Sequence, residues 1–587
     1  MAEFKNPQQE PGLDRRLLLV FAFTFLIILL FQPLLKKYLP QTPATPVQQQ
    51  TQAPPQAAPT PAAAPAAAIT QANPSATAAP PGTKVASAES ETVIESDLYR
   101  IVFTNRGAQV RSWVLKKFDD EKGQPLDLVN KAAAERYGYP LSFWTYDETQ
   151  RNHLNTALYI ASVTGKRSAP VQLTFEYDEQ GWSVRKTFSF DRSYVLHLET
   201  SVLYNGSAVA AYPAWPSGFG DQFTAASFAA ARIDTQFNSN IERMAYKKVS
   251  GGATLHGSYD WAAVVNQYFA AVFIPDNVQD VALVTLRNPL DIPKDPQKPN
   301  GETVRVDVLG AAVGSWRGNA VQRIYVGPKD LNALESTSVP TIAGADADLR
   351  GLVNFGWFGI IARPLFVWLK WIHGYVPNWG WAIVVQTFII TLALLPLRIS
   401  SMKSALKMQK IQPQMNAIKE KYKKYGMRDP RRQEMNTEIG ELMKREGVNP
   451  VGGCLPLIIQ MPFLIAYYRM LGEMIDLRHA HWLWIADLSA KDPWLILPLL
   501  MVGSMVLTQR MTPQTGMDPA QQRMMNVMMP LMMGFIFFNL AAGLNLYYAE
   551  SNLIMIAQQA IMNRTSLGRE MRELAEKRAR KKEKKDK

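Results

Sequence analysis

Long apolar segments near both ends of the 587-residue chain place the strongest constraint on its fold. Residues 17–31 carry no charge and follow Arg15 and Arg16. Five more long, mostly apolar segments lie in the second half, at 379–397, 453–470, 494–507, 525–540 and 544–561. A helix needs about 20 mostly apolar residues to cross a bilayer. The pattern predicts a polytopic α-helical membrane protein with six transmembrane helices.

The first apolar segment is interpreted as an anchor, and a cleaved signal peptide is the alternative. No small-residue cleavage site follows it directly, since Gln32-Pro33 and Lys36-Lys37 come next. Residues 1–39 are therefore expected to form a cytoplasmic N-terminus and a transmembrane helix. Residues 40–84 are rich in Pro, Ala, Gln and Thr. Such a composition buries too little apolar area to order itself, which predicts a flexible linker.

Residues 85–340 have a different sequence pattern, because apolar and polar residues alternate in many short runs. Examples are 171–177, 182–190 and 303–308, separated by turn residues such as Asn205-Gly206. A period of two indicates half-buried strands, so this region is expected to form one large antiparallel β-sandwich. The single cysteine, Cys454, excludes an intrachain disulfide. The sequence shows no nucleophile elbow, phosphate loop or zinc motif, and we expect neither an enzyme nor a bound cofactor or metal.

Segment 351–375 is aromatic and apolar but contains Arg363, Pro364, Lys370 and His373. A spanning helix and an amphipathic helix in the membrane interface are both compatible with it. The charges and the proline favour the interfacial helix.

Loop charges predict the orientation, because cytoplasmic loops are enriched in Lys and Arg. Residues 398–449 contain 13 of these residues and the segment after Asn563 contains 11, whereas 471–493 contains only Arg478 and Lys491. Six spans with both termini in the cytoplasm satisfy every loop. The β-sandwich then lies on the outer side.

The loop 399–449 is itself expected to form a helical hairpin. Its apolar residues recur at steps of three and four. They are Met408, Ile411, Met415, Ile418, Tyr422 and Tyr425, then Met435, Ile439, Leu442 and Met443. Its candidate contact residues are Lys419, Lys421, Lys423, Lys424, Arg431 and Arg432. These basic residues either bind anionic lipid or ribosomal RNA, or form a solvated surface whose charge only sets the membrane orientation of the chain.

Several apolar segments contain polar side chains, which are costly in a bilayer and often functional. They include Gln386, Thr387, Thr391, Gln460, Glu550 and Asn552, with Arg398 just beyond the second span. Each could make a simple interhelical hydrogen bond. Their occurrence on several helices is better explained by a shared hydrated cavity.

Specific motifs resemble those of the YidC/Oxa/Alb family of insertases, over essentially the whole chain. The clearest is Asn449-Pro-Val-Gly-Gly-Cys-Leu-Pro456, which continues to Phe463. Others follow in the same order at 487–493, 518–522 and 543–548, and Tyr325-Val-Gly-Pro-Lys329 resembles the end of that family's periplasmic domain.

The resemblance implies a periplasmic β-supersandwich and a five-helix core, here 376–562, around a hydrophilic groove that is open to lipid and cytoplasm. Motif positions add Met461, Pro462, Tyr547 and Tyr548 to the expected groove. It also implies a cell inner membrane protein that assists insertion and folding of nascent membrane proteins, alone or with the Sec translocon, without ATP hydrolysis. No small-molecule substrate is expected. The basic tail 563–587 is a further candidate for ribosome contact.

Two positions depart from the family pattern. Relatives usually carry an arginine in the second span where this chain has Thr391, and an apolar residue where it has Glu550. Attraction of acidic client segments to a groove arginine is therefore in doubt here. Arg398 could reach back toward Thr391.

Two other classes of protein remain as alternatives. A transporter or channel would also use six spans and buried polar groups, but we find no repeated half and no pair of broken helices. An envelope enzyme acting through the β-sandwich would need a catalytic constellation, which the sequence lacks.

Overall fold

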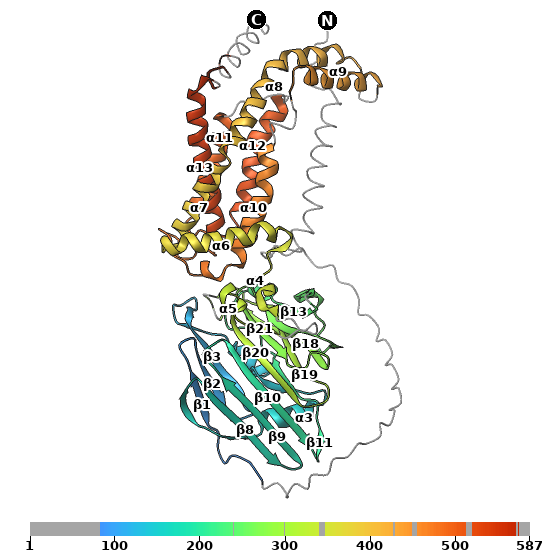
Figure 1. Cartoon of the computed structure of the whole chain (residues 1–587), viewed down its shortest axis with the longest axis vertical. Coiled ribbons are helices and arrows are strands. Elements are labelled where there is room, and N and C mark those ends of the chain that lie inside the picture. Colours follow the sequence, from blue (N-terminus) through green and yellow to red (C-terminus); the bar gives the residue numbers. More distant parts are fainter. Residues whose placement is uncertain are drawn as a thin grey trace. The chain divides into compact units, whose positions relative to one another are not determined.

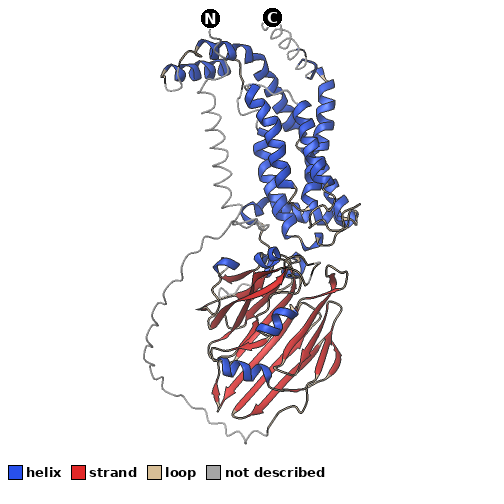
Figure 2. Ribbon diagram, turned by 180° about the vertical axis from the view of Figure 1, so that it is seen from behind, coloured by secondary structure: helices blue, strands red, loops and turns tan. Residues whose placement is uncertain are grey.

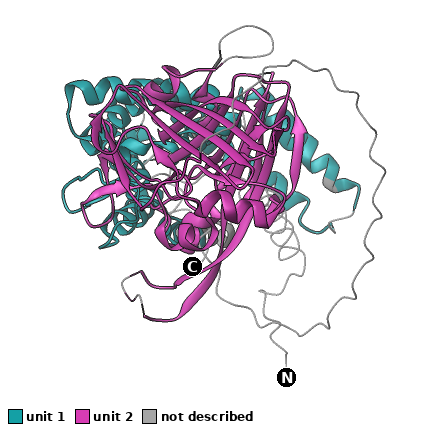
Figure 3. Cartoon of the chain, turned by 90° about the horizontal axis from the view of Figure 1, so that it is seen from below, with its two compact units in different colours: residues 1–39, 353–587 teal, residues 40–352 magenta. Residues whose placement is uncertain are grey.

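The computed structural model describes residues 83–570 and residue 573, except 239, 297, 299, 340–346, 426–428, 449–454, 512–518 and 567. The chain forms two compact units, 40–352 and 1–39 with 353–587 (Figure 3). We call the described parts the β domain (83–352) and the helical core (353–570). The predicted anchor 1–39, nearly all of the linker 40–84 and most of the tail 563–587 lie outside the described residues.

The β domain contains three large sheets and one small one (Figures 1 and 2). The first is β4 (Pro125–Asp127), β3 (Gln109–Asp119), β2 (Tyr99–Thr104), β1 (Glu91–Glu95) and β7 (Gly165–Ser168). The second is β14 (Asn240–Ala245), β13 (Arg232–Phe237), β16 (Trp261–Val265), β17 (Phe269–Pro275), β20 (Ala320–Pro328), β10 (Val195–Tyr204), β9 (Trp182–Phe190), β8 (Val171–Glu179) and β6 (Ile160–Ala161), with β11 (Ser207–Ala208) on β10. The third is β15 (Thr254–Gly257), β18 (Val281–Pro293), β19 (Thr303–Ser315), β12 (Tyr212–Trp215) and β5 (Ser142–Trp144). The fourth pairs β21 (Ser338–Val339) with β22 (Ala347–Asp348).

Short helices join these strands. They are α2 (Lys131–Tyr137), α3 (Glu148–Thr156), α4 (Ala225–Ala229), α5 (Leu331–Glu335), and the 3-10 turns η1 (Tyr246–Lys248) and η2 (Leu349–Leu352). Aromatic side chains connect the sheets. Phe103 on β2 lies 4.8 Å from Phe188 on β9, and Trp113 on β3 lies 6.0 Å from Trp215 on β12, between ring centroids. The mostly-β prediction is confirmed, and these contacts join the first sheet to the second and to the third.

One strand pair differs from the predicted antiparallel arrangement. β1 pairs with β7 in parallel, whereas the other described ladders are antiparallel. Parallel neighbours need a long crossover, and the chain between these two strands runs from residue 96 to 164 and includes α3. The sequence pattern of alternation cannot distinguish these two directions.

Lys186 on β9 is fully buried in the β domain. Its Nζ donates to the carbonyl oxygen of Ala108 at 3.0 Å and to that of Leu141, and it lies 4.3 Å from the Phe143 ring centroid. Ala108 and Leu141 have φ angles of 46° and 61°, a backbone region that is strained for residues with a side chain. Burial lowers the pKa of Lys186 from 10.5 to about 7.

A buried ionic cluster binds the C-terminal end of the β domain. The Asp234 side chain is completely buried, 2.8 Å from Arg232 Nε and 3.9 Å from Arg243 Nε. Arg232 also donates to the carbonyl oxygen of Leu352 at 3.0 Å, and Arg243 to that of Gly351 at 2.7 Å. One carboxylate thus orients two guanidinium groups that bind the end of η2.

Within the described residues, the helical core contains eight α-helices and two short 3-10 turns. They are η3 (Gly356–Phe358), α6 (Gly359–Tyr375), α7 (Trp379–Ala393), α8 (Leu395–Lys421), α9 (Arg431–Arg445), α10 (Leu455–Glu473), η4 (Ile475–Leu477), α11 (Ile496–Met511), α12 (Pro519–Phe537) and α13 (Ala542–Arg564). α7 packs on α13, α11 packs on α13 and α12, and α6 packs on α10. The second predicted span is divided near Leu394, because Pro396 starts α8 and lacks a backbone N–H for the helical ladder.

No single helix among the described residues is both long and apolar enough to meet the criterion for a membrane span. The pair Gly356–Tyr375 and Trp379–Ala393 meets it jointly, with a bend of 120° between the two parts. α13 contains Asn545, Glu550 and Asn552 within its 23 residues.

The two apolar stripes predicted for the loop 399–449 pack against each other. Their buried cluster comprises Ile411, Met415, Tyr422, Met435, Ile439, Leu442 and Val448, with Met408, Ile418, Tyr425 and Met443 packed around it. α8 and α9 therefore form a helical hairpin with its own small core. Asp429 accepts a hydrogen bond from the Arg431 backbone at the start of α9, which lowers the pKa of its carboxyl.

Replacing Leu442 by alanine is expected to destabilise the helical hairpin by about 2 kcal/mol, because it removes a buried side chain from a small cluster that can partly collapse. Faster cleavage between α8 and α9 in limited proteolysis of the full chain would report this. Lys421→Met is the control. Lys421 forms an exposed ion pair with Glu438 at 3.2 Å, which should contribute little to stability because solvent screens it. Equal cleavage of both variants would contradict the packing argument.

Candidate functional site

A chain of polar contacts connects α6, α7 and α10 inside the helical core. Gln386 on α7 is completely buried, and its Nε2 donates to the carbonyl oxygen of Leu365 on α6 at 2.9 Å. Its Oε1 accepts from the Tyr467 hydroxyl on α10 at 2.8 Å. Both ends of the amide are therefore bonded, which fixes the three helices together. Gln386 thus makes interhelical hydrogen bonds, the simple role that the sequence left open for each polar residue.

α13 joins this chain through aromatic stacking. The rings of Tyr467 and Tyr547 are stacked, with centroids 4.1 Å apart and an interplanar angle of 18°. The Glu550 carboxyl, about one turn further along α13, lies beside the Thr387 hydroxyl and close to Tyr467. The structure thus brings together four of the predicted groove residues: Gln386, Thr387, Tyr547 and Glu550.

A second polar contact lies nearer the α7–α8 junction. Arg398 on α8 donates from Nη1 to Gln558 Oε1 on α13 at 3.2 Å, and Gln558 Nε2 lies 3.5 Å from the Thr391 carbonyl oxygen. Arg398 therefore reaches back to the level of Thr391 through one bridging amide. Gln558 follows Glu550 by eight residues, or about 12 Å along a helix. The guanidinium and the carboxylate occupy different levels of the core.

The exposed fraction of the side chains differs among the predicted groove residues. Gln386 and Thr387 are fully buried, and Tyr547 and Asn552 are nearly so, whereas Thr391, Arg398, Pro462, Tyr548 and Glu550 are partly exposed. Met461 on α10 is exposed. Gln460 belongs to α10, but its side chain lies outside the described residues. Polar groups that are partly accessible thus lie on α7, α8 and α13.

The opposite end of the helical core is closed by contacts of the α10–α11 loop. The Trp482 ring lies so close to Gly380 on α7 that an added Cβ would be 2.1 Å from it. The backbone N–H groups of Ala542 and Gly543, at the start of α13, donate to the carbonyl oxygens of Ala490 and Leu488. Asn378 caps α7 and donates from Nδ2 to the His481 carbonyl at 2.9 Å. These bonds link α7, α13 and the loop at one end.

Sequence reasoning missed Tyr467, Gln558 and Trp482. For Tyr467 a signal existed, since it follows Gln460 by seven residues and so shares its helix face. Gln558 is a further amide within the last apolar segment. Nothing local to Trp482 indicates its glycine partner, which lies about 100 residues earlier in the chain.

The predicted contact residues of the helical hairpin lie around its turn. Lys419, Lys421, Lys423, Lys424 and Arg431 are exposed, and the Arg432 side chain lies outside the described residues. Three of them have acidic partners: Lys421 with Glu438, Lys423 with Glu420 and Arg431 with Asp429. The basic character is therefore partly neutralised within the hairpin.

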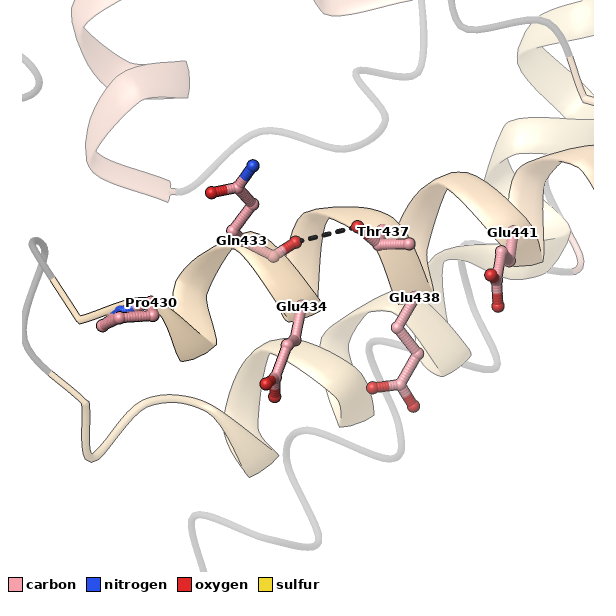
Figure 4. Close-up of a pocket in the computed structure, with 6 residues that line it drawn as sticks. All are labelled: Pro430, Gln433, Glu434, Thr437, Glu438 and Glu441. Carbon is pink, nitrogen blue, oxygen red and sulfur yellow. Dashed lines mark hydrogen bonds between the residues drawn. The ribbon is translucent and has the colours of Figure 1, made fainter.

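α9 also has an acidic side. Figure 4 shows Glu434, Glu438 and Glu441 projecting from this side of the helix, and labels Pro430, Gln433 and Thr437 near them. These residues line a shallow hollow of about 430 Å³. The Thr437 hydroxyl donates to the Gln433 carbonyl at 3.1 Å and so is already bonded within the helix. Any anionic surface must approach the hairpin from another direction.

Comparisons with known proteins divide the chain into two parts that are similar to the β domain and the helical core. Residues 91–368 match the model of the YidC periplasmic domain, and residues 371–569 match that of the 60Kd inner membrane protein. A Geobacter sp. (strain M21) protein named membrane protein insertase YidC is 32% identical over 81% of this chain and 86% of its own length. Proteins of the same name from Burkholderia cenocepacia (34% identity, 82% and 86%) and Maridesulfovibrio salexigens (30%, 94% and 99%) are similar to it as well.

Proposed function

The chain belongs to the YidC family of membrane protein insertases, and we propose that its helical core offers client proteins a hydrated half-passage across the inner membrane. The observation that carries this proposal is the set of partly exposed polar groups on three helices, Thr391, Arg398 and Glu550, above a closed end at Trp482. The open side would face the cytoplasm and the closed side the periplasm.

The energetics of insertion favour such a passage. Moving a polar segment across about 30 Å of hydrocarbon costs several kcal/mol for each unsatisfied group. Hydroxyl, amide and charged groups along part of that path replace lost hydration. Once the client's apolar segment reaches lipid, it gains roughly 0.8 kcal/mol per buried CH₂. This gain drives insertion, so ATP hydrolysis is not needed.

The membrane arrangement that fits this function has six spans with both termini in the cytoplasm. Within the described residues, the proposed spans are α7 with the start of α8, α10, α11, α12 and α13. A helix of the length of α10, with 19 residues, extends about 28 Å, close to the thickness of the hydrocarbon core. α6 meets α7 at a bend of 120°, as an interfacial helix beside a spanning one would. The β domain would be periplasmic.

Partners beyond the client follow from position and charge. The helical hairpin would contact ribosomal RNA or anionic lipid through Lys419, Lys424 and their basic neighbours on the side away from the acidic residues of α9. The basic tail 563–587 would assist at the ribosome. The insertase would act alone or beside the Sec translocon.

Photo-crosslinking of stalled nascent membrane proteins tests the half-passage. Crosslinkers replacing Thr391, which is partly exposed, and Met461, 45% exposed, should capture the client's first apolar segment. Leu499 on α11, 58% exposed and outside the polar set, is the matched control. Capture from both positions no stronger than from Leu499 would exclude the proposed path.

A further inference from the structure

The carboxyl group of Glu550 has an unusual environment for an acid inside a helical bundle. Its Oε2 is buried and has no hydrogen-bond partner among the described residues. Burying such an oxygen without a donor is unfavourable, and unsatisfied buried groups are rare in folded proteins. An ionisable residue within a membrane-embedded helix is usually functional. The group therefore requires an explanation beyond packing.

The hydroxyl groups around Glu550 do not supply the missing hydrogen bond. Thr387 Oγ1 donates to the Ile383 carbonyl oxygen at 2.7 Å, and the Tyr467 hydroxyl donates to Gln386 at 2.8 Å. Each hydroxyl has a single proton to donate. The protons of both neighbours are thus engaged within the protein, and the buried Oε2 has no partner among the described residues.

Neither Arg398 nor Arg469 compensates the charge of Glu550. Arg398 donates to Gln558, which lies about 12 Å further along α13 than Glu550. Arg469 on α10 follows Tyr467 by two residues and so projects from another face of the helix, with its Nε 3.8 Å from the position of a Cβ on Gly356. Among the described residues, none forms an ion pair with Glu550.

We propose that Glu550 is a cation-binding subsite, which receives a lysine or arginine side chain of the client segment that crosses the membrane. This inference rests on the proposed function. Glu550 lies eight residues, about 12 Å, from the closed end of α13, and is the deepest acid in the polar set. A basic side chain passing Arg398 and Thr391 would meet it before the remaining apolar barrier. Pairing there replaces the hydration that the cation has lost.

The test compares clients that differ at one position. The full chain is reconstituted in neutral phospholipid vesicles with a single-span client whose translocated segment carries one Lys, one Gln or one Glu. Insertion is measured as protection of that segment from added protease. Glu550→Gln should lower the insertion rate of the Lys client, relative to that of the Gln client, about tenfold, because hydrogen bonds to charged groups are the stronger ones. Glu550→Asp, which keeps the charge, should retain insertion of the Lys client.

A second measurement uses the unaltered protein. A water-soluble carbodiimide joins a carboxyl to an amine when the two are in contact, and the carbodiimide takes up the water released and becomes a urea. An amide between Glu550 and the client's lysine, mapped by mass spectrometry, is expected for the Lys client.

The outcomes separate the two proposals. An equal slowing of Lys and Gln clients by Glu550→Gln, no slowing of either, or no amide at Glu550 would overturn the cation subsite. If the unaltered chain protects the Gln client no better than protein-free vesicles do, the proposed insertase function itself fails.

Discussion

Replacing Asp234 by alanine is expected to lower the free energy of unfolding of the β domain by about 3–5 kcal/mol. The reason is that Asp234 is the buried anion between Arg232 and Arg243. Without it, two mostly buried guanidinium groups lose the carboxylate that compensates their charge. Removing one partner of a buried ionic cluster is far more unfavourable than removing an exposed pair.

Pulse proteolysis in urea on the full chain would measure this loss. Asp307→Ala is the matched control, since Asp307 lies 2.7 Å from Arg287 but both side chains are about one-third exposed. We expect that control to lose less than about 1 kcal/mol. Hydrogen exchange at residues 349–352 should accelerate only in the Asp234 variant, because Arg232 and Arg243 bind the carbonyls of Leu352 and Gly351. A similar loss in both variants would contradict the assigned role of burial.

The stability of the β domain should rise with pH above 7, by about 3 kcal/mol between pH 6 and pH 9, through Lys186 alone. Its pKa is lowered from 10.5 to about 7 in the folded state. Between these values the unfolded chain binds a proton that the folded chain does not, and stability therefore increases with pH in this window. Below pH 7 the folded state has to bury the charged amine, and this contribution is lost.

The Lys186→Met variant isolates that contribution. It removes the titrating group and should abolish this part of the pH slope, so the difference from the unaltered protein changes by about 3 kcal/mol from pH 6 to pH 9. At pH 9 the variant should be the less stable protein, because the carbonyls of Ala108 and Leu141 lose their donor. Urea unfolding monitored by hydrogen exchange of β9 provides the measurement, with Lys131→Met on the surface as control. If the free energy of unfolding changed with pH in the same way in Lys186→Met and in the unaltered protein, Lys186 would not be the source of the pH dependence.

Local sequence patterns predicted the parts of the fold whose contacts are local. The helical hairpin is the clearest case, since residues at steps of three and four along α8 and α9 form its buried cluster. Strands with alternating burial, such as β9 and β10, were equally visible. In contrast, β16 and β17 are buried along their whole length, and such short continuous apolar runs have no period that distinguishes strand from helix.

The candidate site was only partly predictable, because its bonds connect distant parts of the chain. Polarity within apolar segments identified Gln386, Thr387 and Glu550 as unusual residues. It could not show that Gln386 bonds to Tyr467, 81 positions away, or that Arg398 bonds to Gln558, 160 positions away. Lys186 illustrates the same limit, since its two carbonyl partners lie 78 and 45 positions earlier.

The backbone bonds of Ala542 and Gly543 with the α10–α11 loop, and the Trp482 ring over Gly380, have a consequence for the energised cell. A cavity that held water from one face to the other would let protons and small ions run down their gradients. In the proposed half-passage, an end sealed by a tryptophan and a pair of main-chain bonds would keep the interior wet on one side only, so the membrane would retain its voltage. Clients would then be accepted continuously without draining the store of energy on which the rest of the envelope depends.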